Sequence, residues 1–132
     1  DLLDELREDL GMAMLLITHD LGVVARSAER VAVMYAGRLV ETGTVDDLFR
    51  APAHPYTAAL MASAPRIETV DRLEPIKGSP PNLIALPSGC AFHPRCAYRG
   101  ALCSQVRPEL KAAHPGRAYA CHYPLAEITH AG

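Results

Sequence analysis

Met14-Leu15-Leu16-Ile17-Thr18-His19-Asp20 is the stretch that most constrains the fold, because a continuous apolar run stops abruptly at a histidine and a carboxylate. An apolar run without polar alternation is typical of a parallel strand that is covered on both faces. In open α/β sheets, ligands bind beyond the carboxyl ends of such strands. The run therefore predicts a buried strand over residues 12–17 that delivers the imidazole of His19 to a ligand site.

The composition predicts one modest domain with a hydrophobic core, since 49% of the 132 residues are hydrophobic. The 13 basic and 15 acidic side chains nearly cancel, so the chain has neither an electrostatic footprint for nucleic acid nor a polybasic membrane anchor. The longest apolar segment, residues 11–17, is far shorter than the ~20 residues that cross a bilayer. Because the acidic start is also unlike a secretory signal, we expect a cytosolic protein whose membrane contacts are indirect.

Helices are predicted on both sides of the strand. Asp1 to Leu10 carries leucines at helical spacing and is followed by Gly11, a residue typical of the position just after a helix. Asp20 can cap a second helix over residues 21–29. The expected order of elements is therefore helix, strand, helix.

The next segment predicts a β-hairpin. Residues 31–36 and 38–42 are two β-prone runs separated by Gly37, which is typical of a tight turn. We expect this hairpin to form an antiparallel edge of the sheet.

Short helices should follow the hairpin. Thr44 and Asp47 have the spacing of a capping box, which predicts a short helix through Phe49. A further helix is expected to begin at Pro55, in the favoured first position, and to end before Pro65.

A change in composition near residue 65 divides the chain into an expected first domain, residues 1–65, and an extension, residues 66–132. Residues 74–88 hold four prolines and one glycine, so they are expected to run as an extended surface connector. The extension as a whole is predicted to be irregular and rich in cysteine.

The extension contains all the cysteines of the chain, Cys90, Cys96, Cys103 and Cys121, separated by five, six and seventeen residues. This spacing lacks the pairs of cysteines two residues apart that are usual in zinc knuckles and ribbons. Four thiolates nevertheless suit a soft-metal site, and an iron–sulfur cluster can be held at irregular spacings. The residues alone leave an iron–sulfur cluster, a structural zinc, disulfides and free thiols open, and disulfides would need an oxidising compartment.

Charged and imidazole side chains lie beside the cysteines. His93 and His122 could replace a cysteine ligand, although a neighbouring role is favoured. Arg95, Arg99 and Arg107 would offset the negative charge of a thiolate-ligated cluster, or they are simply solvated.

Several motifs, taken in order, resemble the C-terminal portion of an ABC transporter ATPase of the oligopeptide/dipeptide (and nickel) importer type. Leu16-Ile17-Thr18-His19-Asp20-Leu21 resembles the switch region, and residues 31–41 resemble the hairpin after it. His54-Pro55-Tyr56-Thr57 resembles the signature of this importer subfamily, and the similarity continues through residues 78–83 and 89–90. We expect this four-residue motif to have a structural role.

The resemblance implies an α/β fold, the C-terminal fragment of a P-loop ABC ATPase domain, in an energy-coupling subunit for peptide uptake. It implies that His19 contacts the γ-phosphate of ATP and helps to couple hydrolysis to dimer closure, while Asp20 caps the next helix. The phosphate loop and the Walker B carboxylates of such ATPases would lie before Asp1, so ATP and Mg²⁺ would be bound mostly by residues absent from this chain. The chain alone is therefore predicted to be inactive.

For the four cysteines, the resemblance implies a four-iron four-sulfur cluster, because the extension of some peptide-importer ATPases carries four cysteines at similar spacing that bind one. It further implies partners: membrane permease subunits, a second ATPase subunit and, indirectly, a substrate-binding protein, with the subunit peripheral on the cytoplasmic face of the membrane. The alternative is a stand-alone metal or redox binding module, with zinc or an iron–sulfur cluster.

The isolated chain is expected to be only marginally folded. A sheet without its central strands would leave Leu15, Leu16 and Ile17 with unpaired edges and exposed apolar faces, which predicts self-association.

Overall fold

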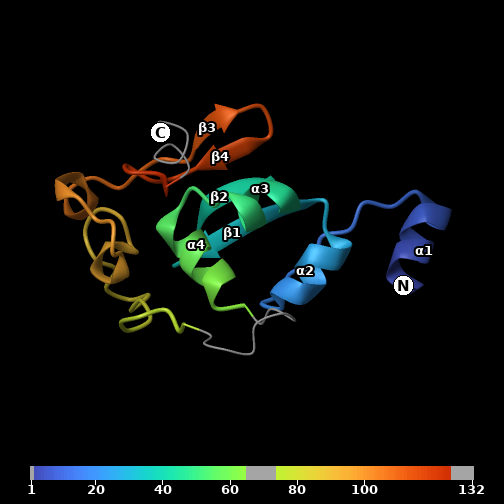
Figure 1. Cartoon of the computed structure of the whole chain (residues 1–132), viewed down its shortest axis with the longest axis horizontal. Coiled ribbons are helices and arrows are strands. Elements are labelled where there is room, and N and C mark those ends of the chain that lie inside the picture. Colours follow the sequence, from blue (N-terminus) through green and yellow to red (C-terminus); the bar gives the residue numbers. More distant parts are fainter. Residues whose placement is uncertain (1, 65–73, 126–132) are drawn as a thin grey trace.

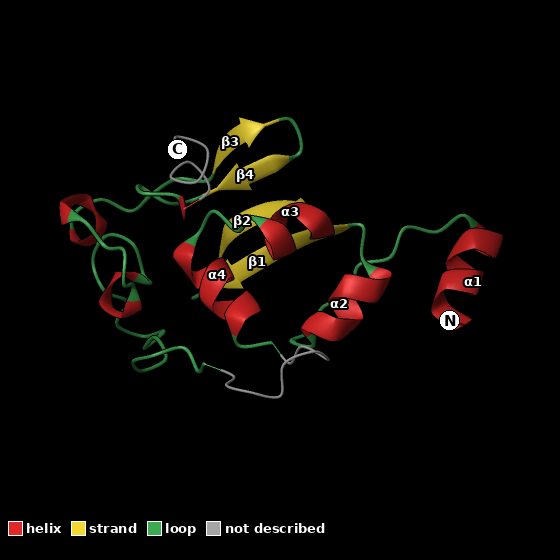
Figure 2. Cartoon of the chain, in the orientation of Figure 1, coloured by secondary structure: helices red, strands yellow, loops and turns green. Residues whose placement is uncertain are grey.

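The computed structural model describes residues 2–64 and 74–125. Its centre is a four-stranded antiparallel sheet in the order β1-β2-β4-β3, with helices α3 and α4 packed over β1 and β2 (Figure 1, Figure 2). The elements are α1 (Leu2–Leu10), α2 (Leu21–Ser27), β1 (Arg30–Tyr35), β2 (Arg38–Thr44), α3 (Val45–Arg50), α4 (Pro55–Ala62), the 3₁₀ helices η1 (His93–Arg95) and η2 (Ala101–Ser104), β3 (Lys111–His114) and β4 (Arg117–Tyr119).

The first two predicted helices are confirmed in the described residues, which exclude Asp1. α1 ends at Leu10 and is followed by Gly11, whose φ of 60° is left-handed. The Met12 amide donates to the Arg7 carbonyl at 3.0 Å. Asp20 caps α2 by accepting from the Gly22 amide at 2.9 Å, and α2 ends at Ser27 rather than at residue 29. No helix within residues 2–64 and 74–125 combines the length and the apolar character that crossing a bilayer requires.

The strand predicted over residues 12–17 is wrong. This segment runs as a loop between α1 and α2 (Figure 2), with Leu15 88% exposed and Ile17 89% exposed. A strand exists only where a neighbour takes up its backbone hydrogen bonds, and none of the four strands of the sheet runs beside this segment. Leu15, Leu16 and Ile17 were expected to have exposed side chains in a sheet without its central strands, and all three side chains are exposed.

The predicted hairpin is confirmed as β1 and β2. Gly37 has φ of 77° and Ala36 has φ of 50°, so two left-handed residues make the tight turn between the strands. β2 continues to Thr44, two residues beyond its expected end. The register shifts between Val33 and Met34, which marks a β-bulge.

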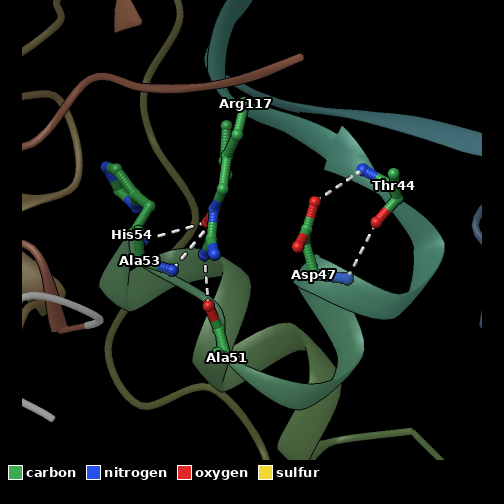
Figure 3. A network of polar contacts seen from close by, with 7 residues as sticks. Thr44, Asp47, Ala51, Ala53, His54 and Arg117 are labelled. Carbon is green, nitrogen blue, oxygen red and sulfur yellow. Dashed lines mark hydrogen bonds and ion pairs between the residues drawn. The ribbon is translucent and has the colours of Figure 1, made fainter. Parts of the chain in front are cut away.

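The capping box predicted for α3 and the start predicted for α4 are also confirmed. The Thr44 hydroxyl accepts from the Asp47 amide at 3.1 Å, and the Asp47 carboxylate accepts from the Thr44 amide at 3.2 Å (Figure 3). These two hydrogen bonds hold the pKa of the Asp47 carboxyl below its usual value. α4 begins at Pro55 and ends at Ala62, and His54 is its N-cap.

The extension is only partly irregular, which corrects the sequence prediction. β3 and β4 form a hairpin whose turn holds Gly116, with φ of 87°, and β4 adds to β2 through the pairs Glu41–Tyr119 and Thr42–Ala118. Residues 74–88 contain neither helix nor strand and are mostly exposed, as expected for a connector. The boundary expected between residues 65 and 66 falls outside the described residues.

An aromatic cluster joins the extension to the first part of the chain. Tyr35 of β1 lies 4.6 Å from Tyr56 of α4 and 5.2 Å from Phe92, measured between ring centroids. Phe92 is buried with Val33, Val40, Leu48 and Met61 in one core. The residues around the cysteines are therefore packed directly on the hairpin and α4.

Candidate functional site

The four cysteines line a single pocket, although they come from four separate places in the extension. Cys90 precedes η1, Cys96 follows it, Cys103 lies in η2, and Cys121 comes two residues after β4. The remaining walls are mainly aromatic and imidazole side chains with two prolines: His54, Pro55, Phe92, His93, Tyr98, Pro108, His122 and Tyr123. The fold thus brings together the four side chains that were predicted to share one site.

Two glycines let the backbone close tightly around this pocket. Gly89 has φ of 72°, and a Cβ there would lie 2.3 Å from the Cys103 carbonyl oxygen. A Cβ on Gly100 would lie 2.4 Å from the ring of Tyr123. The Cys90 amide donates to the same Cys103 carbonyl at 2.8 Å. A larger residue at Gly89 would force apart the loops that carry the cysteines, because it meets backbone atoms, whereas at Gly100 the partly exposed Tyr123 ring can shift.

Backbone amides favour negative charge on the sulfurs. The Gly100 amide donates to Cys103 Sγ at 3.4 Å. The other three sulfurs also accept backbone hydrogen bonds. Cys90 accepts from Phe92 and His93, Cys96 accepts from Tyr98, and Cys121 accepts from Tyr123. Amide donors around sulfur are one of the means by which a protein stabilises thiolates that bind a metal.

Burial opposes this effect and dominates it. It raises the pKa of the Cys90 and Cys96 thiols, and it raises the pKa of Cys121 to about 12. The other cysteines add to the rise, because each thiolate repels its neighbours. Within this structure all four cysteines are free, so the disulfide alternative has no support. Because the pKa of the Cys90, Cys96 and Cys121 thiols is raised, a positive charge supplied to the pocket would favour their thiolate forms.

The thiols do not form a preassembled site for one ion. Among residues 2–64 and 74–125, no group of three or more His, Cys, Asp or Glu side chains is arranged to hold a metal ion. A tetrahedral zinc site needs four donors at about 2.0–2.3 Å from one point.

Four of the histidine and arginine side chains beside the cysteines have backbone partners: His93, Arg95, Arg99 and His122. A ring nitrogen of His93 lies 2.8 Å from the Cys90 carbonyl, and one of His122 lies 2.6 Å from the Val106 carbonyl. Arg95 donates to the Lys77 and Ile76 carbonyls, so it fastens the connector.

A buried carboxylate, missed by the sequence reasoning, organises the wall of the pocket. Glu41 of β2 is 0% exposed and accepts from the Ala53 amide at 2.8 Å, the His54 amide at 2.9 Å and Arg117 Nη2 at 3.2 Å. Arg117 also donates to the Ala51 carbonyl (Figure 3). Strand β4 is therefore tied to the turn between α3 and α4. No local pattern reveals this contact, because Glu41 and Arg117 are 76 residues apart.

His54 connects this network to the cysteine pocket. Its Nδ1 accepts from the Tyr56 amide at 3.0 Å, and its ring centroid lies 6.0 Å from that of Phe92. Burial lowers the pKa of His54 to about 4, so the imidazole is neutral near pH 7. The motif that begins at His54 was predicted to be structural, and its capping role fits that prediction.

His19 lies in a different part of the molecule. It is exposed in the bend just before α2, where the Thr18 hydroxyl accepts from the Asp20 amide at 3.0 Å. It does not line the cysteine pocket. Figure 1 shows α2 and the orange segment that carries η1 and η2 on opposite sides of the sheet. The predicted site residues therefore form two separate groups.

Comparison with known proteins identifies what the chain is similar to. The model of the family described as "Oligopeptide/dipeptide transporter, C-terminal region" matches residues 40–103. The oligopeptide transport ATP-binding protein OppD of Salmonella typhimurium is 44% identical over 128 residues, which cover 96% of this chain and 38% of that protein. The dipeptide transport ATP-binding protein DppD of Haemophilus influenzae is 49% identical over 129 residues, with the same two shares of 96% and 38%. The chain thus spans 38% of the length of these relatives.

Proposed function

We propose that this chain is the C-terminal part of the ATP-binding subunit of an ABC importer for peptides, in the family whose C-terminal region model matches residues 40–103. The observation that carries the proposal is the identity of 44% and 49% to two transport ATP-binding proteins over 96% of the chain. Because the similarity extends across both the segment before residue 65 and the extension, the alternative of a stand-alone metal module has no support. In the complete subunit, ATP hydrolysis drives solute uptake.

His19 is proposed to contact the γ-phosphate of ATP. Phosphoryl transfer needs positioning and charge stabilisation around the γ-phosphate, and an imidazole donor supplies both. Its exposure leaves the ring accessible, and the cap that Asp20 places on α2 holds the following helix. Most contacts to ATP and Mg²⁺ would come from residues outside this chain.

The second part of the proposal is that Cys90, Cys96, Cys103 and Cys121 hold a four-iron four-sulfur cluster. Their common pocket, their amide donors and their burial support it. Zinc is the weaker candidate, since the thiols are not arranged around one point. When bound, such a cluster supplies either one-electron chemistry or a cross-link between the loops.

The partners follow from the same proposal. The subunit would act with a second ATPase subunit and with membrane permease subunits, and indirectly with a substrate-binding protein. It would lie peripherally on the cytoplasmic face of the membrane. Residues 1–65 would complete the nucleotide-binding domain, and residues 66–132 would form its extension.

Two measurements test the two parts separately. The full-length subunit, assembled with its permeases, should lose most ATP hydrolysis and uptake when His19 is replaced by alanine, whereas His114→Ala, an exposed histidine of β3, should leave both unchanged. Unchanged hydrolysis in His19→Ala would remove the catalytic role.

For the cluster, protein purified without oxygen should contain about four irons and four sulfides per chain. It should also absorb visible light, and both signals should be lost in Cys96→Ser and Cys103→Ser. One zinc and no iron would replace the cluster by a structural metal.

A further inference from the structure

The tautomer of His54 is fixed by its surroundings. Nδ1 accepts a hydrogen bond from the Tyr56 amide at 3.0 Å, so Nδ1 carries no proton. Because burial keeps the ring neutral, its single proton must be on Nε2. The imidazole is therefore a hydrogen-bond donor at Nε2.

The position of the ring is fixed as well. The His54 amide donates to Glu41 at 2.9 Å, its carbonyl accepts from the Ala58 amide at 3.1 Å, and its ring centroid lies 6.0 Å from that of Phe92 in a tilted arrangement. Only 1% of the residue is exposed. Figure 3 shows the ring directed away from Ala53 and Arg117. The donor therefore has little freedom to seek a partner elsewhere.

His54 lines the cysteine pocket, and its Nε2 is a donor to be accounted for. Among the described residues, Nε2 has no hydrogen-bond partner, yet it is not one of the completely enclosed unpaired atoms, which are Thr57 Oγ1 and Arg117 Nε. His54 and the adjacent Pro55 both line the pocket that the four cysteines share. His54 also borders a neighbouring hollow of about 90 Å³, which Pro55 does not reach. A buried donor requires an acceptor, and the acceptor chemistry concentrated in the cysteine pocket is sulfur.

We propose that His54 donates a hydrogen bond through Nε2 to a sulfur of the metal cluster held by the four cysteines and thereby raises the reduction potential of the cluster. This inference rests on the cluster assigned under the proposed function. A donor to sulfur stabilises the reduced cluster more than the oxidised one, because the reduced form carries one more negative charge. His54 would thus be a positioning and tuning residue, held in place by Glu41 and by its own cap on α4.

Two substitutions separate the donor from the cap. His54→Asn retains a side-chain oxygen near the place of Nδ1, so it can still accept from the Tyr56 amide, but it has no group at the place of Nε2. His54→Gln places an amide donor near Nε2 and loses the cap. The matched control is His122→Asn, because His122 lines the same pocket while its Nε2 already contacts the Val106 carbonyl.

The experiment compares midpoint potentials in the full-length subunit purified without oxygen, after iron and sulfide contents have been matched. His54→Asn should shift the potential to more negative values, His54→Gln should recover most of the shift, and His122→Asn should leave the potential near that of the unsubstituted protein. An unshifted potential in a His54→Asn protein with full iron content would overturn this inference and leave the cluster intact. A wild-type protein without iron would overturn both the cluster and this inference.

A spectroscopic measurement covers the case in which His54→Asn fails to fold. Protein labelled with ¹⁵N-histidine and carrying His93→Asn and His122→Asn should, in its reduced state, show weak ¹⁵N coupling and one exchangeable proton in pulsed electron paramagnetic resonance. No coupling would overturn the inference. Coupling of the strength expected for a direct nitrogen ligand to iron would also overturn it, because His54 would then be a ligand rather than a donor.

Discussion

Two regions of similar apolar character have opposite environments. In the N-terminal arm, residues 2–20, Leu15 and Ile17 are 88% and 89% exposed, whereas in the body, residues 30–64 and 86–125, Leu48 is 0% exposed and Met61 is 5% exposed. The arm carries the most apolar run of the chain and forms no strand, while the body builds its sheet from strands that contain Arg, Thr and Glu. Neighbouring segments, rather than composition, decide where a strand forms.

The largest expected effect is the loss of the carboxylate that joins the two halves of the body. Glu41→Ala should lower the free energy of unfolding by about 3–5 kcal/mol, because it leaves the Arg117 guanidinium buried without an opposite charge and two buried amides without an acceptor. Urea unfolding followed by tyrosine fluorescence reports on the body alone, since every tyrosine of the chain lies there.

The control for Glu41 is an exposed ion pair within α3. Asp46→Ala removes the contact between Asp46 and Arg50, which is 2.6 Å long but has both side chains at least 70% exposed. It should change the free energy of unfolding by less than about 0.5 kcal/mol. Similar costs for the two substitutions would contradict the role given to Glu41.

The arm and the body can be compared with one substitution made in each. Leu48→Ala should cost about 2–5 kcal/mol, because it leaves a cavity in the core. Leu15→Ala should change the free energy of unfolding by no more than about 0.5 kcal/mol, since the side chain is solvated already. A large cost at Leu15 in urea unfolding would mean that the arm is packed against something.

Two left-handed glycines sharpen the comparison further. Gly89→Ala combines an unfavourable backbone with a Cβ 2.3 Å from the Cys103 carbonyl, so the protein should lose most of its iron. Gly11→Ala in the arm meets nothing within 4 Å, so it should cost only the roughly 1–2 kcal/mol of the left-handed conformation and retain the iron. Full iron content in Gly89→Ala would show that the loops around the cysteines can move apart.

The capping box of α3 should give a smaller and pH-dependent effect. Thr44→Ala should cost about 1 kcal/mol near pH 7. Because the folded pKa of Asp47 lies below its ordinary value of 3.8, its contribution is complete above that value and is lost as the pH falls through the folded pKa. The difference in unfolding free energy between the unsubstituted protein and Asp47→Asn should therefore shrink below pH 4. A difference that does not change between pH 7 and pH 3 would contradict this assignment.

The smallest effect on stability is expected in the arm itself. The double substitution Leu15→Ser and Ile17→Ser should leave the unfolding transition of the body unchanged but reduce self-association of the isolated chain, measured by sedimentation. A monomeric unsubstituted chain at high concentration would contradict the predicted association.

The features that were predictable from sequence are local. Gly11 and Gly37 were expected at turns because glycine readily adopts left-handed backbone. Asp20, Thr44 and Pro55 indicated helix starts because capping and first-position preferences depend only on nearby residues. The four cysteines could be grouped because soft-metal chemistry requires several thiols. Each of these inferences involves residues close in sequence or one distinctive side-chain type.

The features that were missed depend on distant partners. The strand predicted over residues 12–17 was wrong because a β-strand needs a second strand to accept and donate its backbone hydrogen bonds, and an apolar run does not provide one. β4 was not predicted because a run of three residues is too short to indicate a strand by itself, and it becomes one only by pairing with β2. The Pro-Gly dipeptide before it does indicate a turn. A carboxylate is rarely buried without a partner of opposite charge, and the sequence does not show that Arg117 is the partner of Glu41. The burial of Glu41 was therefore not predicted.

The short pairing between β2 and β4 has a consequence for the order of events during synthesis. Until residues 117–119 leave the ribosome, one edge of β2 has no partner and the Glu41 carboxylate has no guanidinium. Cys121 follows β4 by two residues, so closing the sheet also delivers the fourth thiol to the other three. Termination or cleavage of the nascent chain before residue 117 would therefore remove the fourth thiol and the partner of β2 together, which would couple quality control of the extension to assembly of the proposed metal centre.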